Sequence, residues 1–283
     1  MKVIAIVQAR TASKRFPNKV LQKVNGSTLI QILLYRLSLS KKIDKVVVAI
    51  PKNSEENFLG NHISSMGNEV FRGNEKDLLD RYYKAARNYK AKVVVRITGD
   101  CPLIDYQIID KLIDKVVLKK FDYASNVYPP TFPNGLDVSV FTFKLLKKTW
   151  EKAKKKYDRE HVVPLMQRNK QIKKFNLFYS RNLSNERWTI DEFEDFIVIK
   201  NILQYFKKND FKWRKILSLK RKKPNLFYLN KGMARDIGGV QSVKTKLYLR
   251  NIKFKKLQKE YKNYTAIFSK LDRKEKEKYS YLK

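Results

Sequence analysis

Four cationic side chains lie close together near the N-terminus: Arg10, Lys14, Arg15 and Lys19. They follow an apolar run, Val3–Val7, whose length is typical of a buried strand. Small residues around the cations let the backbone approach a ligand closely; these are Ala9, Thr11, Ala12 and Ser13. Guanidinium, ammonium and backbone N–H groups together are suited to binding a polyphosphate. The Walker A pattern is absent, and a solvated basic loop is the alternative interpretation.

A second chemical feature is Asp100, which directly follows another apolar run, Val93–Ile97. Gly99 permits a sharp turn there, and the carboxyl edge of an open α/β sheet is where such folds bind ligands. A carboxylate at this edge can hold Mg²⁺ while the metal also binds phosphate oxygens and water. The alternative is that Asp100 caps the next helix, but Asp105 is better placed for that role.

A third feature is the acidic segment that begins at Asp191 and contains Glu192, Glu194 and Asp195. Asp191 follows an expected short strand, Trp188–Ile190, so we expect it at a sheet edge as well. The other three acids favour the start of a helix through its dipole. Asp191 is therefore a second candidate metal ligand, with a helix cap as the alternative.

The elements that position these side chains are predicted to alternate between strand and helix. Strands are predicted at Val3–Val7, Lys45–Ile50, Glu69–Phe71 and Val93–Ile97. Helices are predicted between them at Thr28–Leu39, Ser54–Met66, Lys76–Tyr89 and Tyr106–Leu118. This order predicts an α/β fold, a Rossmann-like three-layer α/β/α arrangement with a mostly parallel, mixed sheet.

The following part of the chain continues the domain less regularly. Further strands are expected at Tyr123–Asn126, Leu136–Phe141, Phe175–Tyr179 and Trp188–Ile190. Helices are expected over Phe143–Lys155, from near Asp158, and from the acidic segment to about Phe206. We place the main domain at residues 1–210. Residues 211–283 are interpreted as a basic, mainly helical C-terminal extension.

The chain has 283 residues and a formal net charge of +36, from 63 Lys and Arg against 27 Asp and Glu. Such a charge can indicate nucleic acid or an anionic membrane surface. No nucleic-acid motif accompanies it, and we favour a generally lysine-rich surface. No apolar stretch approaches the length of a membrane helix. A single cysteine, Cys101, fits a reducing compartment, so we expect a cytoplasmic protein.

Several ordered blocks of sequence resemble the cytidylyltransferase family, which includes the enzymes that make CMP-Kdo and CMP-sialic acid. The N-terminal block is Val7-Gln8-Ala9-Arg10-Thr11-Ala12-Ser13-Lys14-Arg15-Phe16-Pro17-Asn18-Lys19. Others are 71–73, 77–83, 95–105, 122–126, 132–138, 157–162 and 187–191. Together they span about residues 1–206, and they are most similar to the spore-coat polysaccharide biosynthesis branch.

The resemblance implies a Mg²⁺-dependent nucleotidyl transfer, in which CTP and an acidic sugar-like acceptor give a CMP-linked product and pyrophosphate. It implies these catalytic residues: Arg10, Arg15, Lys19 and Asp100. It implies a nucleotide site formed by Ala9, Arg10, Ser13, Arg15, Lys19, Arg72, Gly73, Asp80 and Thr98. It implies two metal ligands, Asp100 and Asp191. Another nucleoside triphosphate, or a phosphorylated or phosphonate acceptor, is the alternative within the same fold.

Acceptor binding is expected from polar residues in two of the matching blocks: Asn134, Asp137, Arg159, Glu160 and His161. Arg159 could hold an acceptor carboxylate at two points. His161 is either a base or a packing residue at a helix start. A homodimer is expected, as is common among relatives. The basic tail is a candidate for docking to a membrane surface or a partner, whereas a non-catalytic polyanion-binding protein is the remaining alternative.

Overall fold

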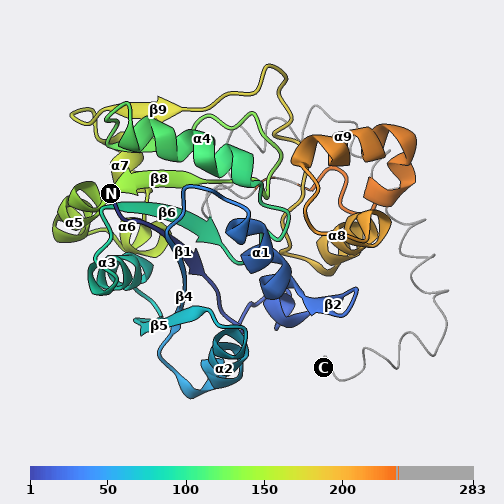
Figure 1. The fold of residues 1–283 in the computed structure, drawn as a ribbon, viewed down its shortest axis with the longest axis horizontal. Coiled ribbons are helices and arrows are strands. Elements are labelled where there is room, and N and C mark those ends of the chain that lie inside the picture. Colours follow the sequence, from blue (N-terminus) through green and yellow to red (C-terminus); the bar gives the residue numbers. More distant parts are fainter. Residues whose placement is uncertain (234, 236–283) are drawn as a thin grey trace.

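The computed structural model describes residues 1–233 and 235, and these residues form an α/β fold around a seven-stranded sheet (Figure 1). The strand order is β5-β4-β1-β6-β8-β7-β9. The strands are β1 (Val3–Gln8), β4 (Lys45–Pro51), β5 (Glu69–Gly73), β6 (Val93–Thr98), β7 (Tyr123–Ser125), β8 (Ser139–Thr142) and β9 (Lys174–Asn176). A separate hairpin pairs β2 (Lys23–Val24) with β3 (Ser27–Thr28).

The sheet is mixed and mostly parallel, as the sequence predicts. Strands β1, β4, β5 and β6 pair in parallel, and β8 is antiparallel to both of its neighbours, β6 and β7. Strand β9 pairs in parallel with β7. The carboxyl ends of β1 and β6 therefore lie side by side at one edge, where Gln8 is in register with Thr98.

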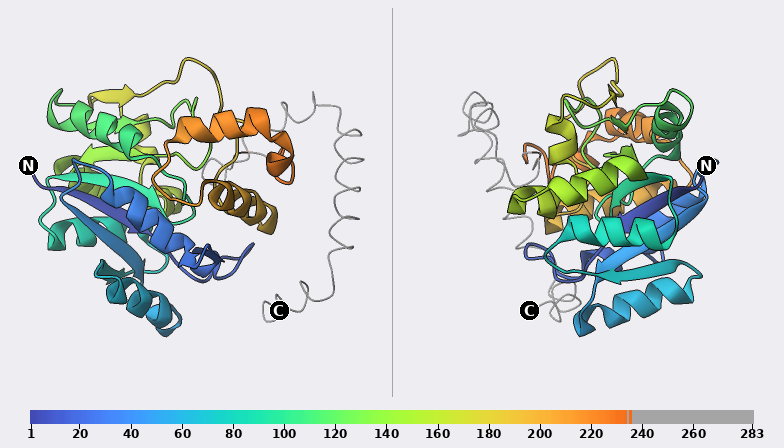
Figure 2. Two further views of the ribbon diagram at one scale, coloured as in Figure 1. Left: turned by 45° about the vertical axis from the view of Figure 1, so that its right-hand side comes forward. Right: turned by 90° about the vertical axis from the view of Figure 1, so that its left-hand side faces the viewer.

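Helices cover both faces of the sheet, so each central strand is buried on two sides (Figure 2). Alternate residues of β1 show this directly, because Val7 packs into one apolar cluster and Ile6 into the other. The first cluster is covered by α1 (Leu29–Ser38), α2 (Asn57–Ser65), α4 (Tyr106–Val117) and α8 (Phe193–Phe206). The second is covered by α3 (Leu78–Asn88), α5 (Phe143–Lys152) and α7 (Pro164–Arg168), with α6 (Lys156–His161) packed on α3.

The segments Trp188–Ile190 and Ser54–Met66 differ in kind or continuity from their predicted structures. The segment Trp188–Ile190 is not a strand; within it the chain is irregular, and the adjacent Arg187 forms only an isolated bridge with Asn134. The predicted helix Ser54–Met66 is divided into a 3-10 turn, η2 (Ser54–Glu56), and α2. The N-terminal cap of that turn is the side chain of Asn53, which accepts a hydrogen bond from Glu56 N.

The first residues of the predicted extension pack on the main core. Helix α9 (Trp213–Lys222) and the turn η3 (Pro224–Phe227) follow α8, and Trp213, Ile216 and Leu219 are buried. Trp213 N donates to the Asp105 carboxylate at 2.9 Å. The predicted domain boundary after residue 210 stays a prediction, and residues 234 and 236–283, where a helical tail is expected, lie outside the described residues.

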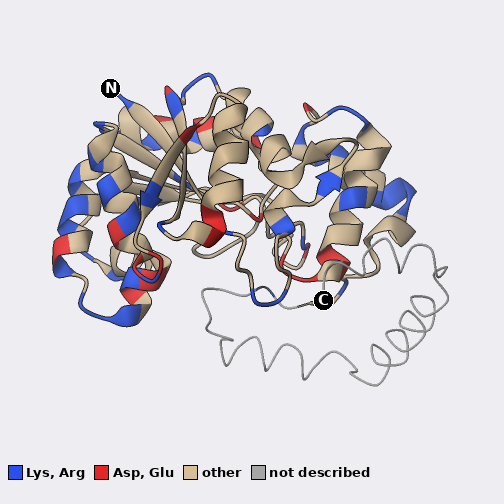
Figure 3. Ribbon diagram, turned by 90° about the horizontal axis from the view of Figure 1, so that it is seen from below, with Lys and Arg blue, Asp and Glu red and all other residues tan. Residues whose placement is uncertain are grey.

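Basic residues are distributed over many elements of the described chain (Figure 3). Blue segments occur on helices of both halves of the view, and the acidic segments are fewer. Among the described helices, none combines the length and apolarity that crossing a membrane requires.

Candidate active site

The N-terminal loop after β1 is fixed by a buried carboxylate, Glu56, at the end of η2. Thr11 N donates to both carboxylate oxygens of Glu56, at 2.9 and 3.0 Å, and Glu56 is fully buried. Asn18 N closes the loop by donating to Thr11 O at 2.9 Å. The loop therefore has a defined shape. Sequence reasoning missed Glu56, because an acid after Asn-Ser is typical of an exposed helix start.

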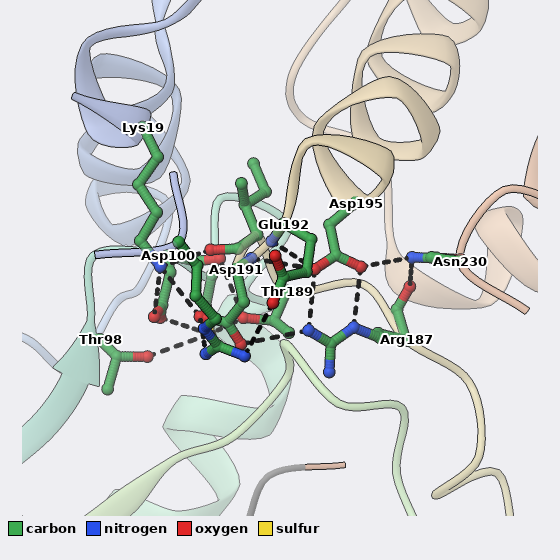
Figure 4. Close-up of polar contacts among 12 residues, drawn as sticks. Lys19, Thr98, Asp100, Arg187, Thr189, Asp191, Glu192, Asp195 and Asn230 are labelled. Carbon is green, nitrogen blue, oxygen red and sulfur yellow. Dashed lines mark hydrogen bonds and ion pairs between the residues drawn. The ribbon is translucent and has the colours of Figure 1, made fainter. Parts of the chain in front are cut away.

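The four cationic side chains of this loop differ in their exposure to solvent. Arg10, Lys14 and Arg15 are exposed, whereas Lys19, at the start of η1 (Lys19–Leu21), is buried. The Lys19 ammonium donates to Asp100 Oδ2 at 3.2 Å, to Asp191 Oδ1 at 3.0 Å and to the carbonyl of Ile190 at 2.5 Å (Figure 4). The structure thus brings together three of the predicted site residues, which come from three distant parts of the chain.

Arg15 adds a second cation to this cluster. Its guanidinium lies 3.1 Å from Asp191 Oδ1 and 3.1 Å from Glu192 Oε1, and its side chain is 46% exposed. Since Lys19 is buried and Arg15 faces solvent, the cluster has an inner and an outer cation. An incoming anion can reach Arg15 directly.

Electrostatics within the cluster favour the charged forms. Burial alone would raise the pKa of the Asp100 carboxyl, but the Lys19 charge and hydrogen bonds from Thr98, Lys19 and Cys101 hold that pKa below its ordinary value. Burial alone would lower the pKa of the Lys19 ammonium, but Asp100 and Asp191 together raise it. At neutral pH Lys19 is therefore an ammonium and Asp100 a carboxylate.

Gly99 is required where the loops after β6 and β1 meet. A Cβ atom at this position would lie 2.9 Å from the main-chain oxygen of Gln8 and 3.1 Å from Cβ of Ala9. Gly99 N also donates to Gln8 O at 2.8 Å. The absence of a side chain therefore lets Asp100 approach the cationic loop. The sequence predicted a turn at Gly99, and its close packing against Gln8 explains why the turn needs glycine.

A second, buried network holds Asp191 from the other side. The Arg187 guanidinium donates to both oxygens of Asp195, each at 2.8 Å, and to Asp191 Oδ2 at 3.3 Å. The backbone N–H groups of Asp191 and Glu192 both donate to Asp195 Oδ2 at 3.0 Å. Asp195 thus fixes the turn that presents Asp191, and the capping box of Glu192 and Asp195 confirms the predicted helix start.

Asn230 completes this network from the C-terminal side. Its amide nitrogen donates to Asp195 Oδ1 at 2.9 Å and to the carbonyl of Arg187 at 3.0 Å (Figure 4). Burial would raise the pKa of the Asp195 carboxyl, but the Arg187 and Asn230 hydrogen bonds and the Arg187 charge lower it. Sequence reasoning missed Arg187, as well as Asn230, whose surroundings look like an ordinary polar loop.

The segment before Asp191 is positioned by the main chain of another loop. Gly135 has φ +105°, and a Cβ atom there would lie 2.4 Å from the carbonyl of Trp188. The preceding residue, Asn134, makes two main-chain hydrogen bonds to this segment: its N donates to Glu186 O at 2.8 Å, and its O accepts from Trp188 N at 2.6 Å. Ile190 N then donates to Asp100 O at 2.9 Å. These main-chain contacts replace the expected strand and bring Asp191 beside Asp100.

The carboxylates fit the chemistry of a Mg²⁺ site that a substrate completes. No group of three or more His, Cys, Asp or Glu side chains with metal-binding geometry occurs in the described residues. Mg²⁺ is usually bound by one or two carboxylates, phosphate oxygens and water, so a complete protein cage is not needed. Asp100 and Asp191, which share one ammonium, match this pattern.

The other expected nucleotide residues lie in separate surroundings. Thr98 joins the cluster through Cys101 Sγ, which lies 3.1 Å from Thr98 Oγ1. Arg72 lies over α2, because a Cβ atom at Gly60 would be 2.4 Å from its Nη2. Asp80 faces α5, where it accepts from Trp150 Nε1 at 3.0 Å. The remaining members are Ala9, which is buried beside Gly99, half-buried Ser13, and Gly73, which is buried at the end of β5.

Two expected acceptor residues already have partners within the protein. Arg159 Nε donates to Asp77 Oδ2 at 2.5 Å, and its Nη1 donates to the carbonyls of Trp150 and Ala153, each at 3.1 Å. Asp137 accepts from Arg235, although burial raises the pKa of the Asp137 carboxyl. Asn134 contributes its main chain to the contact with Trp188.

The other two expected acceptor residues end helix α6. Glu160 is exposed, and the ring of His161 lies 4.6 Å from that of Tyr157. The helix begins at Lys156 and ends at His161, so the alternative that His161 packs at a helix start is wrong, and its role as a base stays a prediction. Val162 follows with φ 69°, and Val163 N donates to His161 O at 2.8 Å. This turn is strained for a β-branched residue and is maintained by the full burial of Val162.

Comparisons with known proteins place the chain in a family. A family model described as cytidylyltransferase matches residues 4–279, so the chain belongs to the cytidylyltransferase family of nucleotidyltransferases. An uncharacterized protein of Methanocaldococcus jannaschii is 41% identical over 81% of this chain and 95% of its own length. The spore coat polysaccharide biosynthesis protein SpsF of Bacillus subtilis is 29% identical over 71% of this chain and 86% of its own length. The resemblance seen in the sequence blocks is confirmed.

Solved structures agree with this assignment. A cytidylyltransferase from Leptospira borgpetersenii is 32% identical, has a TM-score of 0.78, and is similar over 83% of this chain and 99% of its own. A CMP:2-keto-3-deoxy-manno-octonic acid synthetase, solved in complex with CTP, has a TM-score of 0.58 over 72% of this chain and 99% of its own. At 14% identity, the second likeness shows the fold.

Proposed function

We propose that this protein transfers CMP from CTP to a hydroxyl group of a sugar acid, releasing pyrophosphate and supplying a surface polysaccharide or glycolipid. The observation that carries the proposal is the meeting of Lys19, Asp100 and Asp191 beside exposed Arg15. Family membership supports nucleotidyl transfer, and a structurally similar synthetase has been solved in complex with CTP. SpsF supports a role in polysaccharide synthesis.

The proposed reaction is an in-line displacement at phosphorus. The acceptor oxygen forms a bond to the α-phosphorus, and the bond from that phosphorus to the oxygen bridging to the β-phosphate breaks. The bridging oxygen leaves with the electron pair as part of pyrophosphate, and the hydroxyl proton is released. Catalysis of this kind depends mainly on positioning and charge stabilisation.

Each part of the site has a task in this reaction. Arg10, Arg15 and Lys19 bind the triphosphate and stabilise the charge that moves onto the leaving pyrophosphate. Asp100 and Asp191 would hold Mg²⁺, which neutralises phosphate charge when bound. Asp195, through the backbone of Asp191, maintains the position of that carboxylate.

Pyrophosphate release by the full chain tests the proposal. We expect release with CTP, Mg²⁺ and one of a panel of acceptors: 3-deoxy-manno-octulosonate and the sialic, legionaminic and pseudaminic acids. Removal of Mg²⁺ with EDTA should stop it. ATP, GTP and UTP are the matched controls for the base. No release with any acid contradicts the proposed acceptor class, and faster release with another nucleotide contradicts the proposed donor.

A further inference from the structure

Arg96 is a charged residue in the middle of the sheet that none of the contacts described so far uses. In β6 it is in register with Ile6 of β1 and Ser139 of β8. Ile6 packs in the apolar cluster under α3 and α5. Since residues in register on adjacent strands share a face, the side chain of Arg96 leaves the sheet on the α3 and α5 side.

One nitrogen of the half-buried Arg96 side chain lacks a partner within the described part of the chain. Its Nε is buried and has no hydrogen-bond partner, and in the described part of the chain no carboxylate forms an ion pair with it. Burying a charge without a partner is costly, and buried Arg is normally paired. A buried, unpartnered Nε on the residue two positions before Thr98 therefore points to a binding partner outside the protein.

Polar groups occur near Arg96 at the edge of this apolar face, and Asp137 is one of them. Asp137 is close enough for Arg96 to lower its pKa and for Asp100 to raise it, so Asp137 lies near both. Arg235 already binds the Asp137 carboxylate, which leaves the Arg96 charge incompletely balanced. On the adjacent strand, Ser139 is in register with Arg96, and its Oγ lies 3.0 Å from Tyr123 Oη. Gln167 Nε2 donates to the same Tyr123 hydroxyl.

Arg96 lies on a different element from the cations that suit phosphates. The exposed cations that suit phosphates, Arg10 and Arg15, belong to the loop after β1. Arg96 instead projects from β6, next to β8 and near Asp137. A planar guanidinium binds a carboxylate at two points, and nearby hydroxyl groups suit the hydroxyls of a sugar.

We propose that Arg96 binds the carboxylate of the acceptor sugar acid. This inference rests on the proposed function, because it assigns the acceptor of the same site. Arg96 then takes the acceptor-binding role that the sequence suggested for Arg159. Arg159 is less available for that role, because it already donates to Asp77 and to two carbonyls.

The first test compares Arg96→Gln with wild type and with Arg87→Gln, an exposed control on α3. We expect the acceptor KM to rise about 10- to 100-fold in Arg96→Gln, with the KM for CTP unchanged, as loss of a hydrogen-bonded charge partner predicts. Arg87→Gln should behave as wild type. An unchanged acceptor KM in Arg96→Gln overturns the inference.

A second variant separates binding from a structural role. Arg96→Met removes the unpaired charge and keeps most of the side-chain volume, so we expect its melting temperature to equal or exceed that of wild type. Acceptor KM should nevertheless rise as in Arg96→Gln. A lower melting temperature together with a wild-type acceptor KM would assign Arg96 a structural role and overturn the inference.

The carboxylate itself is tested by changing the ligand. In wild type, the panel acid with the highest activity should be used about 10- to 100-fold better than its carboxamide, and in Arg96→Gln the two should be used equally. Melting-temperature shifts with each acid provide a readout without turnover. A shift that depends on Arg96, without pyrophosphate release, refutes the proposed function alone; turnover with equal preference for the acid in both proteins refutes the role of Arg96 alone.

Discussion

Two neighbouring charge clusters in this protein are built differently. The cluster of Lys19, Asp100 and Asp191 is partly open, with side-chain exposures of 11%, 27% and 16%. The cluster of Arg187 and Asp195 is sealed, with exposures of 4% and 0%, and Asn230 completes its hydrogen bonds. The open cluster can exchange partners when a ligand arrives, whereas the sealed cluster can only maintain geometry.

Asp191 belongs to both clusters and shows what the difference means. One of its oxygens accepts from Lys19 and the other from Arg187. Its backbone N–H is fixed by Asp195. Asp191, which we expect to contact a ligand, is thus held in position by the buried side chains of Arg187 and Asp195. We expect changes in the open cluster to affect activity most and changes in the sealed cluster to affect stability most.

The largest effect is expected from neutralising an acid of the open cluster. Asp100→Asn and Asp191→Asn should each reduce kcat for pyrophosphate release by about 10³-fold or more, since metal binding contributes several kcal/mol to the transition state. The circular dichroism spectrum should stay that of wild type. Asp114→Asn, at an exposed ion pair on α4, is the control. Near-normal turnover in either site variant would refute the metal assignment.

The sealed cluster is broken most directly by Asp195→Ala. This change leaves Arg187 buried without its main partner, and we expect the free energy of unfolding to fall by about 3–5 kcal/mol. Urea denaturation followed by circular dichroism measures this quantity. Glu194→Ala, one residue away and half-buried, should change it by about 0.5 kcal/mol or less. Similar unfolding curves for the two variants would contradict the comparison.

A smaller effect is expected from Asn230→Ala. It removes the donor to Asp195 Oδ1 and to the Arg187 carbonyl, so the free energy of unfolding should fall by about 1–3 kcal/mol. Exposed Asn225→Ala in the same segment is the control. Equal stability of both variants would show that the segment after α9 does not support the site.

The smallest effect is expected in the pH dependence of the free energy of unfolding, which tests the stabilising role of the sealed cluster. The folded pKa of Asp195 lies below its ordinary value of 3.8, so the ionised carboxylate stabilises the fold. That stabilisation is fully present above pH 3.8 and is lost as the pH falls through the lower folded pKa. Urea unfolding from neutral pH down to about pH 2 should show a steeper loss for wild type than for Asp195→Asn. Parallel curves would contradict the assignment.

Much of the site could be predicted because it follows from rules about sheets. The ends of parallel strands meet at one edge, so the loop after β1 and Asp100 after β6 had to be neighbours. Helix capping could also be predicted from residues close in sequence. Asp105 was predicted to cap α4, and its side chain accepts a hydrogen bond from Gln107 N. These features depend on residues close in sequence or on the strand order that alternation imposes.

The unpredicted parts depend on tertiary contacts that no local pattern encodes. Trp188–Ile190 has the composition of a strand, yet its partner is the main chain around Gly135. Glu56 resembles a solvated helix start, yet it is buried beneath Thr11. The charge of Lys19 suggested a phosphate ligand, but its position between two carboxylates appears only when three segments converge.

Lys19 also links the assembly of the candidate site to the folding of the chain. Because its ammonium joins carboxylates from two loops to the N-terminal segment, three parts of the chain acquire their relative positions during folding. The conformational entropy of assembling them is lost at that stage, and little remains to be lost when a substrate binds. We therefore expect the hydrogen bonds that hold these three segments together also to limit the rate of the proposed reaction.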